Sequence, residues 1–150
     1  LRAREAGKVG AIGYSGDGDG LAWAARVAEF DVLECSINLF DQRALDLVGA
    51  KRVLAKRSLG NAPWRDDRRP DRADRAIYWD RMHAMFDAPP TLETAVRFAA
   101  WCGVACALVG TSSEAHLAAV VAASAKGPLP EAGAIRERFA RVGADWAGVT

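Results

Sequence analysis

The sequence predicts an α/β protein built around a parallel sheet, and three observations lead to this class. Four short apolar segments of strand length alternate along the chain with segments of helical periodicity. The strand-length segments lead into turns that contain Gly, Asn or Asp. The composition, 51% hydrophobic and 26% charged in 150 residues, is that of a globular chain rather than a disordered one. We therefore expect residues 1–150 to form a single domain.

The first half of the chain supplies three of the expected strands. They are residues 9–13, 31–37 and 52–56, with helices predicted at 21–30 and 43–48. Residues 1–8 are typical of the last turn of a helix that ends at Gly7. Asp41 is the expected N-cap of the second helix. The Asp-Gly alternation of residues 14–20 is interpreted as a loop and not as a calcium site, because the closing Glu is missing.

A polar loop separates these strands from the fourth. Residues 57–75 contain the mixed-charge run 65–69, whose charges nearly cancel, so a solvated loop is favoured over a nucleic-acid patch. The helices expected after it span 73–86, 92–100 (with Thr91 as its cap) and 131–146.

The fourth strand, residues 105–109, meets Gly110 and then Thr111-Ser112-Ser113, and an Ala-rich helical pattern follows at once. A strand that turns at Gly into a hydroxyl-capped helix directs free backbone N–H groups and a positive dipole end at the mouth of a sheet. Such a junction binds anions, phosphate above all. A plain serine N-cap accounts for the same pattern, and both interpretations stay open at this point.

Composition narrows the classes of partner. The net charge is +1, so no bulk field favours nucleic acid or a membrane surface. No apolar run approaches the length of a membrane span, and no signal-peptide core is present near residue 1. Cys35, Cys102 and Cys106 lie in apolar segments, which fits reduced thiols and a cytoplasmic location. No second Cys/His pair accompanies Cys102 and Cys106, so no metal site is expected.

The order of elements narrows the fold. Short strands that alternate with helices indicate parallel strands joined by right-handed crossovers. Four such units, with extra helices, form either a small open sheet or one half of a TIM-type (β/α)₈ barrel. The shortness of the strands favours the half barrel.

Four segments then resemble strand-end motifs of one enzyme family, in order and at compatible spacing. They are GKVGAIGYS at 7–15, ECSINLFD at 34–41, AKRSLG at 55–60 and LVGTSSEAHL at 108–117. These segments are similar to the fifth to eighth strands of aldo-keto reductases, and Asp145-Trp146-Ala147-Gly148 ends as many of these chains end. The resemblance covers essentially the whole chain, but only the C-terminal half of such an enzyme.

The resemblance implies a cofactor-binding role without catalysis. In this family the C-terminal half holds NADPH, and the catalytic Asp, Tyr, Lys and His lie on the first four strands. Nothing in this chain corresponds to those strands, and Tyr14 and Lys56 are not their counterparts. We therefore expect no catalytic residue here and no aldehyde reduction by the chain as it stands.

The resemblance also implies which residues meet the cofactor. Ser15 and Glu34 match positions that hold the nicotinamide carboxamide. Lys56, Arg57 and Leu59 match the stretch along the nicotinamide and pyrophosphate. The positions that match the loop around the adenosine 2′-phosphate are Gly110, Thr111, Ser112 and His116.

Several departures predict that NADP(H) binding is weak or lost. Glu34 replaces a Gln, and a carboxylate accepts hydrogen bonds from an amide but donates none. Gly16 replaces the usual Asn, and Ala119-Val120 replace the Glu-Asn pair near adenine. His116 stands where many members have Arg, and a neutral His contributes less to phosphate binding.

Two functions follow from these observations. The first is an NADP-linked oxidoreductase half that is active only with a complementary N-terminal half chain. The second is a non-catalytic remnant or scaffold that acts through self-assembly as a homodimer, or through a partner chain. The retained Lys56 and Arg57 favour the first function, and the altered Gly16 and Glu34 favour the second.

Overall fold

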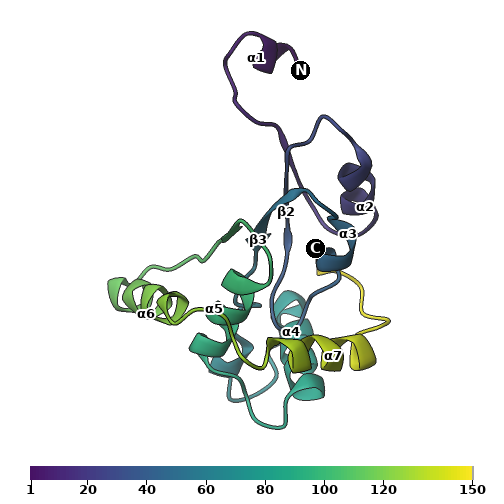
Figure 1. Ribbon diagram of the computed structural model, residues 1–150. Helices are drawn as coiled ribbons and strands as arrows, with labels where there is room; N and C mark the ends of the chain where they lie inside the picture. The colour runs from purple at the N-terminus through teal and green to yellow at the C-terminus, as the bar shows by residue number, and fades with distance from the viewer. Residues whose placement is uncertain (150) are drawn as a thin grey trace.

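The computed structural model describes residues 1–149 and contains one sheet of four parallel strands in the order β1-β2-β3-β4 (Figure 1). The strands are β1 (Gly13–Ser15), β2 (Val32–Ser36), β3 (Arg52–Lys56) and β4 (Cys106–Ala107). The helices are α1 (Arg2–Glu5), α2 (Gly18–Arg26), α3 (Ala44–Leu47), the 3₁₀ turn η1 (Pro63–Arg65), α4 (Ala73–Met85), α5 (Leu92–Trp101), α6 (Glu114–Ala125) and α7 (Ala132–Val142).

The sequential strand order decides between the two expected architectures. A doubly wound open sheet reverses its strand order at a switch point. Here each strand lies beside its predecessor, as in one half of a (β/α)₈ barrel. The predicted half barrel is therefore confirmed. Figure 1 shows α2 and α3 on one side of the strands, α6 on the other, and α4 and α7 beyond the strand ends.

The two faces of the sheet differ in burial. Leu33 and Cys35 of β2 and Val53 and Ala55 of β3 are buried in a cluster with side chains of α2 and α3. Side chains alternate along a strand, so Glu34 and Leu54 point to the opposite face. There Ser15, Glu34, Leu54 and Cys106 form one row across the register; the outer two are exposed and the inner two are half-buried.

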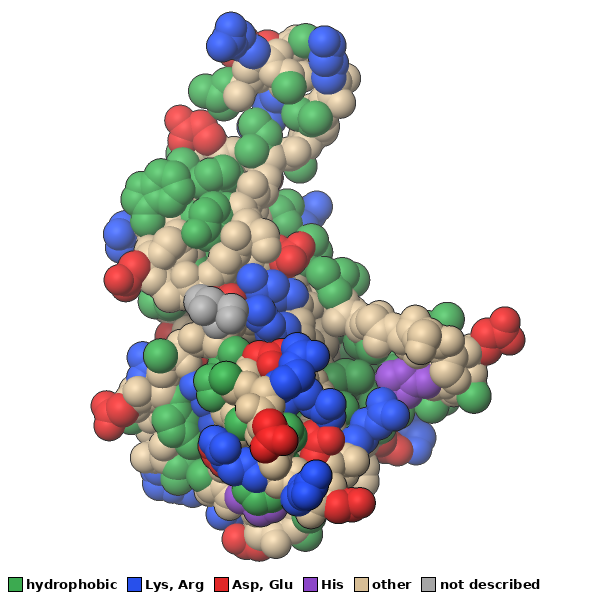
Figure 2. Space-filling model, turned by 180° about the vertical axis from the view of Figure 1, so that it is seen from behind, with side chains coloured by type: hydrophobic (Ala, Val, Ile, Leu, Met, Phe, Trp, Pro, Cys, Tyr) green, Lys and Arg blue, Asp and Glu red, His purple; other side chains and the backbone are tan. Residues whose placement is uncertain are grey.

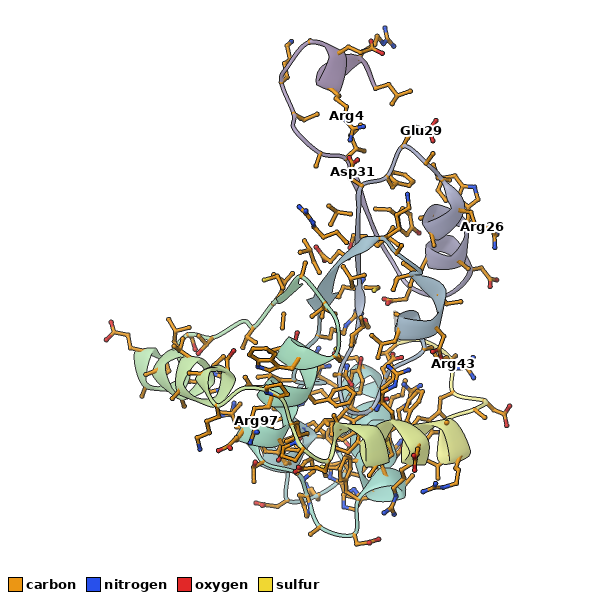
Figure 3. All side chains as sticks on the ribbon, viewed as in Figure 1. Arg4, Arg26, Glu29, Asp31, Arg43 and Arg97 are labelled. Carbon is orange, nitrogen blue, oxygen red and sulfur yellow. The ribbon has the colours of Figure 1, made fainter. Side chains whose placement is uncertain are left out.

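A second core lies beyond the carboxyl ends of the strands. It joins the segment after β2 to α4, α5 and α7, and its largest buried side chains are Phe40, Tyr78, Phe98, Met82 and Met85. Arg97 of α5, labelled in Figure 3, donates to the carbonyls of Gly127 and Pro128 after α6. This core supports the turns that follow β2 and β3.

Most predicted elements are present with small shifts at their ends. Strand 52–56 is confirmed in full, and Thr91 and Ser113 cap α5 and α6 by accepting from the N–H groups of Thr94 and His116. The first strand begins only at Gly13 instead of residue 9. The fourth is two residues long, although Ala105 N and Leu108 N continue its hydrogen bonds to β3. No helix of residues 1–149 is long and apolar enough to cross a membrane.

The predicted cap at Asp41 is wrong. The N-cap position of α3 is Arg43, which makes no side-chain cap. The Asp41 side chain is buried instead, where it accepts from Val149 N at 3.3 Å and lies 3.6 Å from Arg81 NH1. Arg81 is buried as well, donates to the carbonyls of Phe40 and Ala147, and lies 5.0 Å from the centre of a Trp146 ring. The ion pair joins α4 to the segment after β2, and the hydrogen bonds of its two members to Ala147 and Val149 hold the C-terminal segment against both.

We predict that Arg81→Met destabilises the fold by about 3–5 kcal/mol, because it leaves the buried Asp41 carboxylate without its cation. Burial raises the pKa of Asp41, whereas the Val149 N–H and the Arg81 charge lower it. Loss of Arg81 raises this pKa further, so Asp41 takes up a proton at higher pH than an ordinary aspartate, and the loss of stability is larger at about pH 7 than near pH 4. Urea unfolding at both pH values tests this. Arg138→Met, which removes an exposed ion pair, is the control; equal losses for both variants would contradict the prediction.

The three thiols differ in burial, and this predicts their reactivity. Burial, followed by the charge of Asp17, raises the pKa of Cys35 to about 12, and burial raises that of Cys102 to about 11. Cys106 is exposed. Because the thiolate is the reactive form, only Cys106 should react promptly with Ellman's reagent at about pH 8. Cys106→Ser should abolish the fast phase and Cys35→Ser should leave it; a fast phase of two thiols would refute the assignment.

Candidate functional site

The carboxyl ends of β1, β2 and β3 bring together polar side chains from three strands. We call Ser15, Asp17, Glu34, Ser36, Lys56 and Arg57 the strand-end cluster. Ser15 Oγ donates to Glu34 Oε1 at 3.2 Å, so two residues predicted to share a ligand group are neighbours. In parallel α/β folds, ligands bind at this edge of the sheet.

Asp17 is the centre of this cluster. Its side chain is 6% exposed, and its Oδ2 lies 3.1 Å from Lys56 Nζ and 3.5 Å from Arg57 NH1. The carboxylate also accepts from Ser36 N at 2.7 Å and from Ser36 Oγ at 3.1 Å. Sequence reasoning assigned Asp17 to a flexible loop and missed this role. The only local signal was an acidic residue directly before α2, and such residues are common there.

The turn after β3 sets the direction of Arg57. Arg57 has a φ of +51°, and its NH1 donates to Ser36 Oγ at 2.9 Å and to Val149 O at 2.8 Å. Three residues on, Gly60 has a φ of +54°, and an added Cβ would come within 2.7 Å of the Phe40 ring. Leu59 is partly buried against the second core, so it supports the turn.

Tyr14 gives a physical reason for Gly16, which replaces an Asn of the family pattern. The Tyr14 ring packs against Trp23 and Phe30. A Cβ on Gly16 would lie 2.6 Å from that ring, so a larger residue requires Tyr14 to move. The loss of the Asn is therefore coupled to the position of Tyr14.

The residues predicted near a phosphate line a separate cleft of about 610 Å³, which we call the α6 cleft. Gly110, Thr111, Ser112, Ser113 and His116 form one wall. Ala62, Trp64, Arg65 and Leu92 form the other. The cleft thus lies between the loop after β3 and the N-terminus of α6, and it does not include the strand-end cluster.

Polar groups of the α6 cleft are organised by the start of α6. His116 Nδ1 lies 2.8 Å from Thr111 Oγ1, and Ser113 Oγ accepts from His116 N at 3.4 Å. The helix that begins here has twelve residues, so its first turn presents backbone N–H groups and a positive dipole end. Ser113 therefore caps α6, as predicted, and the cap is compatible with an anion bound at the neighbouring backbone N–H groups.

Arg65 is a second residue that sequence reasoning missed. It belongs to a mixed-charge run interpreted as a solvated loop, but the 3₁₀ turn after Ala62 directs it to the α6 cleft beside Trp64. Other charges of this loop form ion pairs: Arg69 with Asp80, and Arg75 with Asp66. Pro63 at the start of the turn was the available signal, because proline favours the first position of a helical turn.

The described residues contain no group of three or more His, Cys, Asp or Glu side chains that could hold a metal ion. The two sites offer hydrogen-bond donors and cations, and the strand-end cluster also holds the carboxylates of Asp17 and Glu34. The strand-end cluster contributes two cations, and the α6 cleft contributes Arg65, His116 and a helix N-terminus.

The comparison with solved structures agrees with this fold. The sequence itself matches no protein-family model and no curated protein. Among solved structures, the chain is similar to the aldo-keto reductase AKR11C1 from Bacillus halodurans in its holo form, with a TM-score of 0.67 and 16% identity. The match covers 99% of this chain and 54% of that one, so the chain spans about half the length of the solved enzyme. The chain therefore has the fold of half an aldo-keto reductase barrel, as its motifs predict.

Proposed function

We propose that this chain is the cofactor-holding half of an aldo-keto reductase-type barrel. It binds NADP(H) weakly and reduces no carbonyl compound without a complementary half. The observation that carries the proposal is the α6 cleft. It gathers Thr111, Ser112 and His116, the residues that the family resemblance assigns to the 2′-phosphate, and it adds a cation, Arg65.

The chemistry of the cleft supports a phosphate. Backbone N–H groups at the start of α6 and the hydroxyl of Ser112 supply donors. The Thr111 hydroxyl already donates to Ser113 O at 3.2 Å, so a phosphate must compete for it. Arg65 supplies a planar guanidinium suited to two phosphate oxygens. Trp64 and Leu92 supply apolar area for the adjoining nucleoside. These features fit the adenosine end of NADP(H).

The nicotinamide end fits less well. Ser15 Oγ already donates to Glu34, so a carboxamide must compete for that hydroxyl. The Glu34 carboxylate accepts from an amide NH₂ but donates nothing to its oxygen. Lys56 and Arg57 are engaged with Asp17. The proposed binding is therefore weak and is supported mainly at the α6 cleft.

Bound NADPH supplies a hydride, and the residues of this chain would hold and orient it. Carbonyl reduction also needs a group that donates a proton to the substrate oxygen. By resemblance that group belongs to the half of the barrel that has no counterpart here. Tyr14, the tyrosine nearest the strand ends in sequence, packs in an aromatic cluster with Trp23 and Phe30. We therefore expect no turnover from this chain alone.

Titration with NADPH tests the cofactor proposal. Trp64 lines the α6 cleft, so its fluorescence reports on binding there. We expect saturable quenching by NADPH and about tenfold weaker binding of NADH, which lacks the 2′-phosphate; this ratio corresponds to about 1.4 kcal/mol. Arg65→Gln should weaken NADPH binding more than NADH binding. Arg68→Gln, an exposed arginine three residues away that does not line the cleft, should change neither.

Absence of quenching by the unmodified chain up to millimolar NADPH would end the cofactor proposal. Equal affinities for NADPH and NADH would contradict the proposal that the α6 cleft binds the 2′-phosphate.

The second candidate function, assembly without redox chemistry, is favoured by the exposed flanks of the sheet. Beside β1, Trp23 of α2 is 53% exposed, and Figure 2 shows apolar side chains on the surface at α2. Beside β4, Trp101, Leu117 and Val121 are exposed on α5 and α6. A two-fold rotation along the barrel axis would place β4 of one copy parallel to β1 of the other and close an eight-stranded barrel. Both exposed strand edges would then be paired.

Sedimentation equilibrium tests this assembly. At about 100 μM we expect a mass near twice the 16.0 kDa of one chain, because unpaired edges and exposed apolar flanks favour association. Val121→Glu places a charge on the α6 flank and should shift the mass toward one chain. Ala122→Glu adds the same charge about 100° further around the helix and should have little effect. If the unmodified protein has the mass of one chain at this concentration, the proposed homodimer is excluded.

A further inference from the structure

The two cations of the strand-end cluster already share a carboxylate. Lys56 Nζ and Arg57 NH1 both approach Asp17 Oδ2, at 3.1 and 3.5 Å. The Asp17 side chain is nearly buried, whereas the two cations are 22% and 31% exposed. The carboxylate therefore occupies the inner side of both cations, at the carboxyl ends of the strands where a bound anion would lie.

Asp17 is fixed in that position by neutral donors as well. Ser36 N donates to Oδ1 at 2.7 Å and Ser36 Oγ to Oδ2 at 3.1 Å, while Arg57 NH1 donates to Ser36 Oγ at 2.9 Å. Ser36 is fully buried. Together these groups give the two carboxylate oxygens the donors that two oxygens of a phosphate would otherwise receive.

We propose that Asp17 is a built-in counter-ion that competes with a phosphate for Lys56 and Arg57. An anion gains the full attraction of these cations only when the Asp17 carboxylate moves aside, because two like charges at one position repel. Asp17 also lines a cleft of about 220 Å³, which offers space for its side chain to turn. The cation Arg43 and two further carboxylates, Asp19 and Asp41, line the same cleft. Figure 3 shows Arg43 at this side of the molecule, near the C-terminal segment.

This inference rests on the proposed function in one respect: it takes Lys56 and Arg57 as the part of the cofactor site that meets the pyrophosphate. It adds that this chain limits its own phosphate affinity through Asp17. The α6 cleft does not include Asp17 and is not affected.

Asp17→Asn is the central variant, because the amide keeps the size of the side chain and an oxygen for Ser36 N while it removes the charge. Asp19→Asn is the matched control: it removes the same charge two residues away, at an exposed position in the first turn of α2. Asp17→Ser is the second variant for the case in which the amide variant does not fold. It places a hydroxyl at the N-cap position of α2, where the Asp17 side chain makes no cap hydrogen bond.

The probe is inorganic pyrophosphate, measured by isothermal titration calorimetry at low and physiological salt. We expect Asp17→Asn to bind pyrophosphate at least about tenfold more tightly than the unmodified chain. Its affinity should also fall more steeply with salt, because Lys56 and Arg57 no longer face the Asp17 charge and both attract the anion. Asp19→Asn should bind like the unmodified chain. Adding Lys56→Met to Asp17→Asn should remove the gain. Equal pyrophosphate affinity for the folded Asp17 variants and the unmodified chain would overturn the inference.

NADPH titrations separate this inference from the proposed function. If the unmodified chain and Asp17→Asn bind NADPH with equal affinity, the cofactor proposal stands and the counter-ion inference falls. If neither binds NADPH but Asp17→Asn gains affinity for pyrophosphate, the counter-ion stands and the cofactor proposal falls.

Discussion

The register between β2 and β3 is the constraint on which the rest of the structure depends. Five residue pairs, from Val32–Arg52 to Ser36–Lys56, hold these strands together. Because side chains alternate, this register buries Cys35 and Ala55 under α2 and α3 and leaves Glu34 on the opposite face. A slip of β2 by one residue would turn Glu34 into the apolar layer under the helices, and a slip of β3 would do the same to Lys56, at a large cost in stability. The same register brings Ser36 and Lys56 side by side at the strand ends, so both the core and the strand-end cluster depend on the pairing of β2 with β3.

The features that sequence predicts well are those set by neighbouring residues. Strand 52–56 follows from a short β-rich run, and the caps at Thr91 and Ser113 follow from one hydroxyl before a helical pattern. The half barrel follows from the alternation of such elements. By contrast, the first strand is misplaced because Gly10 and Ala11 are apolar by composition but lie outside the ladder. Where β1 begins depends on which of its residues pair with β2, and the residues of β1 alone do not reveal this pairing.

The α6 side of the site is predictable because its motif is continuous in sequence. Residues 110–116 form a loop and the start of α6, and Gly110, Thr111, Ser112, Ser113 and His116 line one cleft. The ion pairs of Asp17 and Asp41 were missed because the partners lie far along the chain: Lys56 and Arg57 for Asp17, Arg81 and Val149 for Asp41. Asp41 was expected to cap a helix and Asp17 to lie in a loop, and only the folded chain reveals that each carboxylate pairs with a cation.

The C-terminal segment gives the cluster an order of assembly. Val149 N donates to Asp41 and Val149 O accepts from Arg57, a residue 92 positions earlier, while Ala147 O accepts from Arg81. A ribosome makes the chain from its N-terminus, and closing such a long loop precedes any gain from the contact. The strands and α4 can therefore form while Arg57 and Asp41 still lack these partners. The hydrogen bond from Arg57 to Val149 O therefore forms only after residue 149 has been synthesised and has docked, whereas the contacts of Asp17 with Ser36, Lys56 and Arg57 need no residue after 57.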